Sequence, residues 1–333
     1  MRWLYRFRIS SGTGSPHDKE VVSMTAARPG RVGGVRAAGL PYLLILPAVL
    51  IVAAVAGWPL VKIVILSLSK QESSKFALFH HRGSTPFVGF DNYTAVLTDS
   101  TFWTVVIRTV VFTAVNVIIS LLLGMAFAVL MNRVSNWARL LLTAVLLFVW
   151  AVPSTVSSQV FYWMFNNQFG VVNYLLDKLP GVHMQGHDWF ADPVQGLAVV
   201  SVVVIWGALP LLAISLHAGL TQVPPDVLEA ARVDGASNWQ SFRNVTLPYL
   251  RPLLIIMTTL SIIWDFGVFN QIFFMRNGHP EPGYQTIGVY MYAEGVGSSR
   301  YNVGSTIAIL MMVAVFVMMA VYIRQLIRMG DAE

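Results

Sequence analysis

The chain contains no cysteine, and charged residues make up only 11% of its 333 positions. The missing thiols exclude disulfides, thiolate catalysis, cysteine metal sites and a lipid-modified N-terminal cysteine. So little charge, with a hydrophobic fraction of 56%, is not the composition of a soluble domain. Length alone predicts about two globular domains. Apolar runs of about 20 residues, long enough to cross a bilayer as helices, instead favour one polytopic helical bundle.

Motifs for catalysis and nucleotide binding are missing as well. The sequence has no Gly-x-x-x-x-Gly-Lys-Ser/Thr loop for phosphates, no HExxH motif and no nucleophile elbow. His183 and His187 have a spacing that could hold a metal, but no third ligand accompanies them. We therefore predict no metal site and no cofactor on this chain.

Six uncharged runs predict an all-α membrane protein with six transmembrane helices. The predicted spans are about 40–61, 105–131, 140–165, 194–220, 250–274 and 303–323. Together they predict one transmembrane domain over 40–326, followed by a short tail, 327–333. Residues 1–39 are rich in Arg, Gly and Ser and are interpreted as a mostly disordered arm, not a cleaved signal peptide; Met24 is an alternative start to Met1.

The distribution of Lys and Arg predicts the orientation of the chain. With the N-terminus inside, the inner segments hold fourteen of these residues and the outer loops hold six. Because positive residues favour the cytoplasmic side, both termini and the loop 221–249 are predicted to be cytoplasmic. This bias also explains the net charge of +6 without a nucleic-acid partner.

The polar loop 221–249 is predicted to fold as a helix, a glycine elbow and a second helix. Pro225 suits a first helical turn, and Gly235 is placed to end that helix in a left-handed conformation. Ser237 and Gln240 have the spacing of a capping box. The first helix and its end carry small and acidic residues: Glu229, Ala230, Ala231, Asp234 and Gly235. On these residues alone, a solvated hairpin and a docking surface are equally supported.

The resemblance of this loop to a known family favours the docking surface. Residues 229–252, EAARVDGASNWQSFRNVTLPYLRP, resemble the EAA loop in permease subunits of binding-protein-dependent ABC importers. The similarity covers about residues 40–326, including Trp150-Ala151-Val152-Pro153. Within the family it is nearest to maltose-permease-like, carbohydrate-importing members of the disaccharide or trehalose type. The sequence departs from that type at Asn270, where Asp is usual, and at 277–280, where Gly-Gly-Gly-Pro is common.

The resemblance implies that the loop is a cytoplasmic coupling helix, which meets a separate ATPase subunit through the five residues named above. It implies a second, homologous permease subunit, two ATPase subunits that bind ATP and Mg, and an extracytoplasmic substrate-binding protein. The implied location is the lipid of a bacterial cytoplasmic (inner) membrane. The implied function is import of a di- or oligosaccharide by alternating access, with this chain a transport subunit and not an enzyme.

Polar and aromatic residues inside the predicted spans are candidates for the substrate path. Asp265 is the most informative, because a charge inside an apolar helix is costly and should face protein or water. The candidates are Asp265, Asn270, Gln159, Tyr162, Trp163, Trp264 and Asn116. The aromatic rings among them could stack on a sugar. Structural hydrogen bonds and interfacial aromatic belts are the alternative roles.

Three other functions remain open from the sequence. The same machinery could import a glycerol-phosphate-type polyol ester, for which a basic cavity is expected. An ion-driven carrier would need no ATPase and should show an inverted repeat. An intramembrane enzyme would need paired catalytic groups at one depth, whereas Asp265 stands alone.

Overall fold

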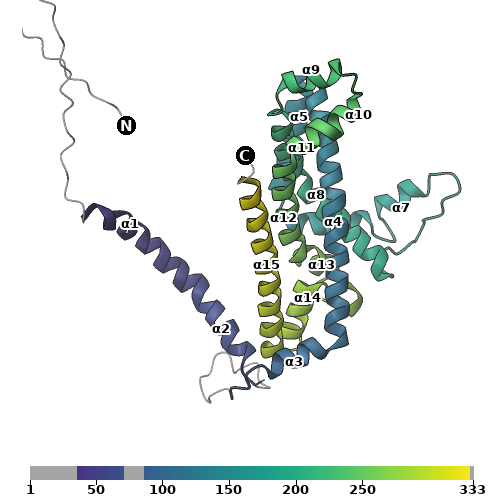
Figure 1. Ribbon diagram of the computed structural model, residues 1–333. Coiled ribbons are helices and arrows are strands. Elements are labelled where there is room, and N and C mark those ends of the chain that lie inside the picture. The colour runs from purple at the N-terminus through teal and green to yellow at the C-terminus, as the bar shows by residue number, and fades with distance from the viewer. Residues whose placement is uncertain (1–35, 71–85, 331–333) are drawn as a thin grey trace, which may run out of the picture. The chain divides into compact units, whose positions relative to one another are not determined.

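The structure is helical, with turns and loops between the helices. The computed structural model describes residues 36–70 and 86–330 (Figure 1). Within these ranges, strand-like pairing is limited to an isolated bridge between Ser69 and Phe87. The all-α prediction is therefore confirmed where the chain is described. The predicted arm, 1–39, lies outside the described residues up to residue 35, as do the last three residues of the predicted tail, 327–333.

The chain divides into two compact units, Met1–Gly57 and Trp58–Glu333. The described part of the first unit consists of helix α1 (Arg36–Val52) and a π-helical turn, η1 (Ala53–Gly57). The elements of the second unit follow in order: α2 (Trp58–Ser67), α3 (Asp91–Thr98), α4 (Ser100–Arg133), α5 (Asn136–Ala151), α6 (Ser154–Met164), α7 (Val171–Leu176), α8 (Pro193–Leu220), α9 (Pro225–Val233), α10 (Asn238–Ser241), η2 (Phe242–Thr246), α11 (Leu247–Tyr249), α12 (Arg251–Phe266), α13 (Asn270–Met275), η3 (Pro282–Tyr284), α14 (Ile287–Tyr292), η4 (Ala293–Gly297) and α15 (Tyr301–Gly330).

Four helical stretches of the described residues are long and apolar enough to cross a membrane: Leu44–Ser67, Ser100–Arg133, Pro193–Leu220 and Tyr301–Gln325. Two bent pairs of helices pass the same test, and counting each pair as one span gives up to six. Local signals explain where the long helices begin. Asp99 accepts a hydrogen bond from Thr101 N at 2.8 Å and caps α4. Asp192 accepts two from the first turn of α8, which opens on Pro193.

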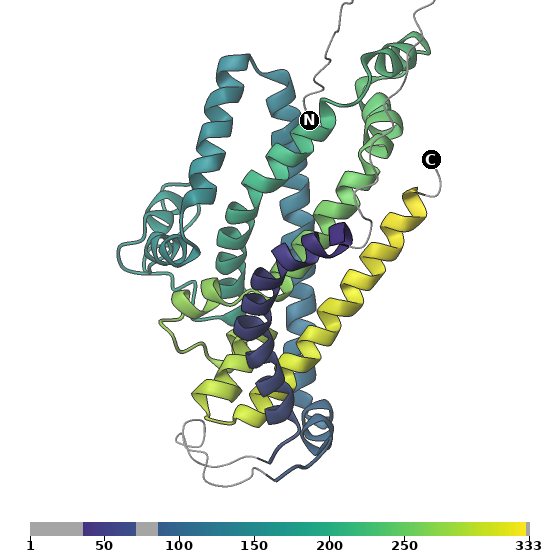
Figure 2. The same cartoon turned by 90° about the vertical axis from the view of Figure 1, so that its left-hand side faces the viewer.

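The prediction of one continuous helix over 140–165 is wrong. α5 ends at Ala151, α6 begins at Ser154, and their axes meet at 100°. This corner is visible at the left of Figure 2. Its cause is local: Pro153 disfavours helical geometry in the residue before it, and Val152 is extended, with φ −73° and ψ 124°.

The continuous helix predicted over 250–274 is also wrong. α12 ends at Phe266, and a short link through Gly267 leads to α13 at Asn270. The N-terminal end of α12 is bent as well, by 70° relative to the helical segment Asn238–Tyr249. Length and hydropathy cannot reveal such breaks, because a broken span is as apolar as a straight one.

The core of the second unit is built around α4 and α8, which run side by side (Figure 1). They approach closely at Gly124, where an added Cβ would lie 2.7 Å from Leu212 Cβ. Small residues let helix backbones come close where no hydrophobic effect drives helices together in lipid. Buried side chains such as Val200, Val203 and Ile272 fill the adjoining core.

Gly124→Ala should therefore force α4 and α8 apart. Overpacking of this kind costs about 1–3 kcal/mol, so the apparent melting temperature of the purified protein should fall. Gly207→Ala is the matched control, because Gly207 lies in α8 and has open space around it. Equal melting temperatures for the two variants, measured by intrinsic tryptophan fluorescence, would contradict a tight α4–α8 contact.

Candidate functional site

The polar loop between α8 and α12 has the predicted local structure. α9 has Pro225 in its first turn. α10 opens on a complete capping box, in which Ser237 N donates to Gln240 Oε1 at 2.8 Å and Gln240 N donates to Ser237 Oγ at 3.3 Å. We call the segment 225–241 the hairpin.

Gly235 forms the elbow of the hairpin. Its φ of +83° is left-handed, as predicted. Its N–H donates to Arg232 O at 3.0 Å, and the N–H of Ala236 donates to Ala231 O at 2.9 Å. These two bonds are the Schellman pattern that closes a helix on a left-handed residue. The angle between α9 and α10 is therefore set by one glycine.

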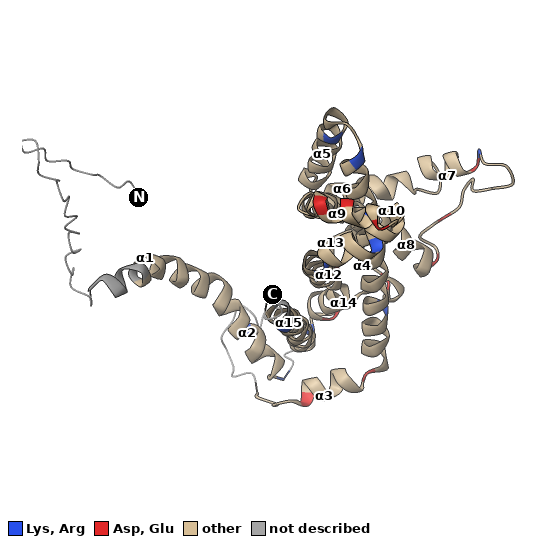
Figure 3. Cartoon of the chain, turned by 45° about the horizontal axis from the view of Figure 1, so that its top comes forward, with Lys and Arg blue, Asp and Glu red and all other residues tan. Residues whose placement is uncertain are grey.

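The surface of the hairpin is unusually open. α9 buries none of its residues. Glu229 and Ala230 are exposed, and so are two large apolar side chains, Val233 at 87% and Trp239 at 67%. Figure 3 shows acidic residues at α9, which also carries Arg232 in its last turn. Exposed apolar side chains beside fixed charges mark a surface suited to contact with another molecule.

A cavity of about 340 Å³ lies where the two broken spans meet. One wall comes from the α5–α6 corner, with Trp150, Val152 and Ser154, and another from the α12–α13 break, with Gly267 and Asn270. α8 supplies Val203, Val204, Trp206, Gly207 and Ala208. Irregular backbone at membrane depth is tolerated where it is buried in protein or lines a water-filled cavity. The α5–α6 corner and the α12–α13 break both line this cavity, so both have the surroundings in which irregular backbone is tolerated.

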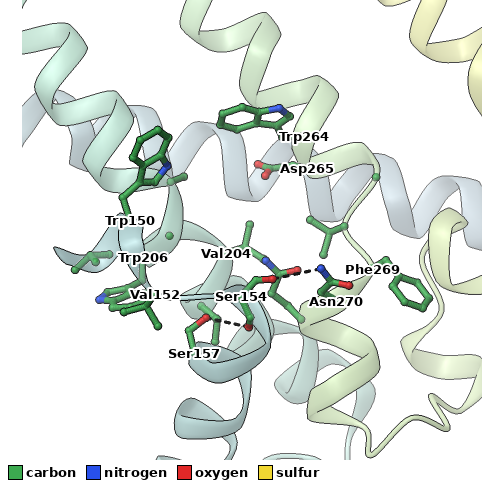
Figure 4. Close-up of a pocket in the computed structure, with 17 residues that line it drawn as sticks. Trp150, Val152, Ser154, Ser157, Val204, Trp206, Trp264, Asp265, Phe269 and Asn270 are labelled. Carbon is green, nitrogen blue, oxygen red and sulfur yellow. Dashed lines mark hydrogen bonds between the residues drawn. The ribbon is translucent and has the colours of Figure 1, made fainter. Parts of the chain in front are cut away.

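The side chains of this cavity combine aromatic rings with a few polar groups (Figure 4). Trp150 and Trp264 are 60% and 51% exposed, whereas Asp265 is buried. Among the described residues, the Oδ2 atom of Asp265 has no hydrogen-bond partner. Asn270 Nδ2 donates to Ser154 Oγ at 3.3 Å and so links α13 to α6. The cavity therefore offers flat apolar faces and a few polar groups to a ligand, and it adjoins a buried carboxyl oxygen of Asp265 that has no partner among the described residues.

The structure brings together three of the seven residues proposed for the substrate path. Asp265, Trp264 and Asn270 line the cavity, whereas the other four do not: Asn116, Gln159, Tyr162 and Trp163. Asn116 is fully buried within the bundle, and its Nδ2 donates to Phe112 O at 2.7 Å.

The remaining candidates lie on α6. The Tyr162 ring centroid is 5.4 Å from that of Phe190, and Trp163 is 59% exposed. Gln159 has a buried side-chain oxygen without a partner in the described part of the chain. Sequence analysis missed Trp150 and Trp206 as cavity residues. Both residues are tryptophans, and that was the signal available in the sequence. The length of an apolar run does not reveal which face of a helix lines a cavity, so this signal could not be used.

A cluster around Arg276 fixes the loop that follows α13. The Arg276 guanidinium lies 4.3 Å from the Tyr284 ring centroid and pairs with Glu281. Hydrogen bonding to Arg276 lowers the pKa of Glu281, so this ion pair stabilises the loop at neutral pH and is lost as pH falls through the lowered pKa. Tyr284 Oη donates to Phe190 O at 2.7 Å. The loop is thereby tied to the segment that precedes α8.

Comparison with known proteins identifies the class of this chain. Residues 120–328 match the family described as binding-protein-dependent transport system inner membrane component. The chain is 38% identical to the diacetylchitobiose uptake system permease protein DasB of Streptomyces coelicolor, over 91% of this chain and 94% of that protein. It is 32% identical to the trehalose/maltose transport system permease protein MalF of Thermococcus litoralis, over 87% and 94%. The chain therefore belongs to the family of binding-protein-dependent transport system inner membrane components.

Solved structures agree on the fold. A crystal structure of a bacterial ABC transporter that imports the acidic polysaccharide alginate superposes with a TM-score of 0.73 at 18% identity, covering 88% of this chain and 97% of that one. A second structure, in complex with an alginate pentasaccharide-bound periplasmic protein, has a TM-score of 0.70 at 18% identity, covering 86% and 94%. The protein is thus a multi-pass transport component of the inner membrane with the ABC-permease fold.

The absence of native cysteine makes the cavity directly testable. Asn270→Cys should react with a membrane-impermeant thiol reagent at least about tenfold faster than Val111→Cys, because a thiol in a wet cavity ionises and one facing lipid does not. Val111 is the control, since it lies on α4, is 57% exposed and does not line the cavity. Asn116→Cys should stay unlabelled, because Asn116 is buried. Similar rates at all three positions would refute a water-filled cavity.

Proposed function

We propose that this chain is one permease subunit of an ATP-driven ABC importer that carries a di- or oligosaccharide across the bacterial cytoplasmic membrane by alternating access. The observation that carries the proposal is the cavity at the two broken spans, with its three tryptophans and one carboxylate. Indole rings offer flat apolar surface to a sugar ring, and a few placed polar groups can bond its hydroxyls. The names of the relatives, which refer to diacetylchitobiose and to trehalose and maltose, support this substrate class.

The chemistry of the cavity disfavours a phosphorylated polyol. Its described lining residues include one acid, Asp265, and no Lys, Arg or His. A carboxylate repels a phosphate, whereas it accepts hydrogen bonds from hydroxyl groups. The family membership likewise disfavours an ion-driven carrier. A neutral sugar therefore fits better than either alternative.

Energy and substrate would come from partner proteins. We propose two ATPase subunits that bind ATP and Mg, a second homologous permease subunit and an extracytoplasmic substrate-binding protein. The family description supports the binding protein, as does the alginate transporter solved with a periplasmic protein. The sequence has no phosphate loop, which supports ATP hydrolysis on a separate subunit. The fourteen-to-six distribution of Lys and Arg supports cytoplasmic termini and a cytoplasmic hairpin.

The hairpin is the proposed contact with the ATPase. The residues proposed for this contact are Glu229, Ala230, Ala231, Asp234 and Gly235. Exposed Val233 and Trp239 on the same hairpin support it, because a partner would remove them from water. ATP binding would close the ATPase pair, and the hairpin would pass that motion to α8 and α12. Both helices line the cavity, so the cavity would change the side to which it opens.

Asp265→Ala should lower uptake about 10- to 100-fold at unchanged abundance, which is the usual effect of removing one hydrogen bond to a charged group. Asp265→Asn should retain more uptake, because it keeps an acceptor. Ser261→Ala is the control, since Ser261 is buried one turn away on α12 and does not line the cavity. The measurements are labelled-disaccharide uptake and membrane abundance in the same cells. Parallel loss of both quantities would assign Asp265 a structural role instead.

Gly235→Val should abolish uptake while the chain still inserts into the membrane. A left-handed conformation costs a β-branched residue more than about 1 kcal/mol, so the substitution would change the angle between α9 and α10. Glu229→Ala should do the same by leaving a charge on the ATPase unpaired. In the reconstituted complex, ATP hydrolysis should stop responding to loaded binding protein.

Two control variants separate coupling from general damage. Gly181→Val places the same strain, φ +79°, outside the hairpin and should keep the coupling. Gly235→Asn should keep part of it, because asparagine tolerates this conformation. If Gly235→Val and Glu229→Ala retain both substrate-stimulated hydrolysis and uptake, the hairpin is an ordinary solvated loop.

A further inference from the structure

A second cavity of about 340 Å³ lies between the hairpin and the ends of two long helices. α4 contributes Asn132 and Arg133 from its last turn, and Leu220 comes from the last residue of α8. The hairpin supplies Arg232 and Ser241. The cavity is separate from the proposed substrate path, with which it shares no lining residue.

Two arginines give this cavity a positive charge. Its described lining residues include Arg133 and Arg232 and no Asp or Glu. The ion pairs found within residues 36–70 and 86–330 are Arg276–Glu281 and Arg300–Glu294, so neither cavity arginine has a carboxylate partner there. Each sits in the last turn of its helix, where a cation is favourable. That position explains why each helix has an arginine in its last turn, but not why both arginines line one cavity.

Ser241 is an independent sign that this cavity takes a ligand. The residue is 8% exposed, and its Oγ has no hydrogen-bond partner in the described part of the chain. Buried hydroxyls normally have a partner, because leaving one unpaired costs free energy. Ser241 lines the cavity together with the arginines, so an acceptor bound there would satisfy it. Asn132 and Asn238 add amide groups to the same wall.

We propose that this cavity binds a phosphate group, bridging the end of α4 and the hairpin. Guanidinium groups match the geometry of phosphate oxygens, and a serine hydroxyl adds one further donor. The phosphate has two sources: the headgroup of an anionic phospholipid, or a free phosphate. The cavity lies at the ends of two apolar helices, where basic pockets meet lipid headgroups. Its occupancy would hold the hairpin against the bundle.

The test uses the purified complex in neutral detergent, titrated separately with phosphatidylglycerol, phosphatidylcholine and inorganic phosphate. Native mass spectrometry should show phosphatidylglycerol, and not phosphatidylcholine, retained at one site per chain. Arg133→Gln and Arg232→Gln should each weaken that binding about tenfold, as expected for one lost charge-assisted hydrogen bond. Arg243→Gln is the control, because Arg243 is exposed just after the hairpin and lies outside the cavity; it should bind like the unchanged chain.

Ser241→Ala separates a ligand contact from a structural role. Without phosphate, this variant should melt no lower than the unchanged chain, because it removes a buried hydroxyl that has no partner. With phosphatidylglycerol bound, the lipid-induced rise in melting temperature should shrink. A lower melting temperature under both conditions, with lipid affinity unchanged, would make Ser241 structural and would count against the proposal.

Competition by inorganic phosphate identifies the source. Displacement of phosphatidylglycerol by millimolar phosphate would support a site open to free phosphate, and retention of the lipid would support a headgroup site. The proposal is wrong if Arg133→Gln and Arg232→Gln bind lipid and phosphate like Arg243→Gln. The proposal is equally wrong if the two arginine variants lose the ATPase subunit while their lipid and phosphate binding is unchanged. In that case the arginines would contact a carboxylate of the ATPase and not a phosphate. The cavity is argued without reference to the sugar, so either failure leaves the proposed function standing.

Discussion

The structure depends on one constraint: lipid cannot hydrogen-bond to the backbone, so every peptide group inside the membrane must find a partner in the protein. This chain interrupts two apolar segments, at Val152–Pro153 and at Gly267–Phe269, and places both interruptions on one cavity. Some of the freed groups are satisfied by neighbours. Thr286 Oγ1, for example, donates to Val268 O at 3.1 Å. The cavity is therefore lined by the irregular backbone of both interruptions, and that backbone positions Asn270 and Ser154.

Two helices connect this cavity to the hairpin. α8 lines the cavity with Trp206 and ends at Leu220, just before the hairpin. α12 begins at Arg251, shortly after the hairpin, and carries Trp264 and Asp265 at its other end. In the proposed coupling, a change in the tilt of the hairpin would reach both walls of the cavity through these two helices. The Schellman elbow at Gly235 sets the angle between the two helices of the hairpin, α9 and α10.

Features with local causes could be predicted from the sequence. Proline at a first turn, glycine at a helix end and a serine–glutamine capping box act within a few residues, so these three features of the hairpin are confirmed. The helical segment does not stop at Pro248, however, but continues to Tyr249. The apolar runs were also found, because their length is set by the membrane. Pro153 and Gly267 gave no reliable sign of the breaks, since proline and glycine are also tolerated in continuous spans.

The composition of the cavity could be predicted only in part. Asp265 was identified because a lone charge in a span is costly. Asn116 was an equally polar candidate, but it does not line the cavity: its Nδ2 donates to the backbone of its own helix, and its Oδ1 is buried without a partner among the described residues. The sequence does not distinguish Trp206 from other tryptophans in membrane helices, because it does not show which face of α8 lines the cavity. The assignment of polar residues to a path therefore requires the packing of helices that are distant in sequence.

The central claim is that the hairpin couples ATP to the cavity, and the rate of thiol labelling at Asn270→Cys in the reconstituted complex tests it directly. The reagent is supplied from the hairpin side, with and without trapped ATP and loaded binding protein. The account predicts that trapping slows labelling at least about tenfold, and that Gly235→Val removes this dependence while leaving the ATP-free rate unchanged. The claim is contradicted if trapped ATP does not change the labelling rate when residue 235 is glycine. It is also contradicted if trapped ATP changes the labelling rate equally in the Gly235→Val variant.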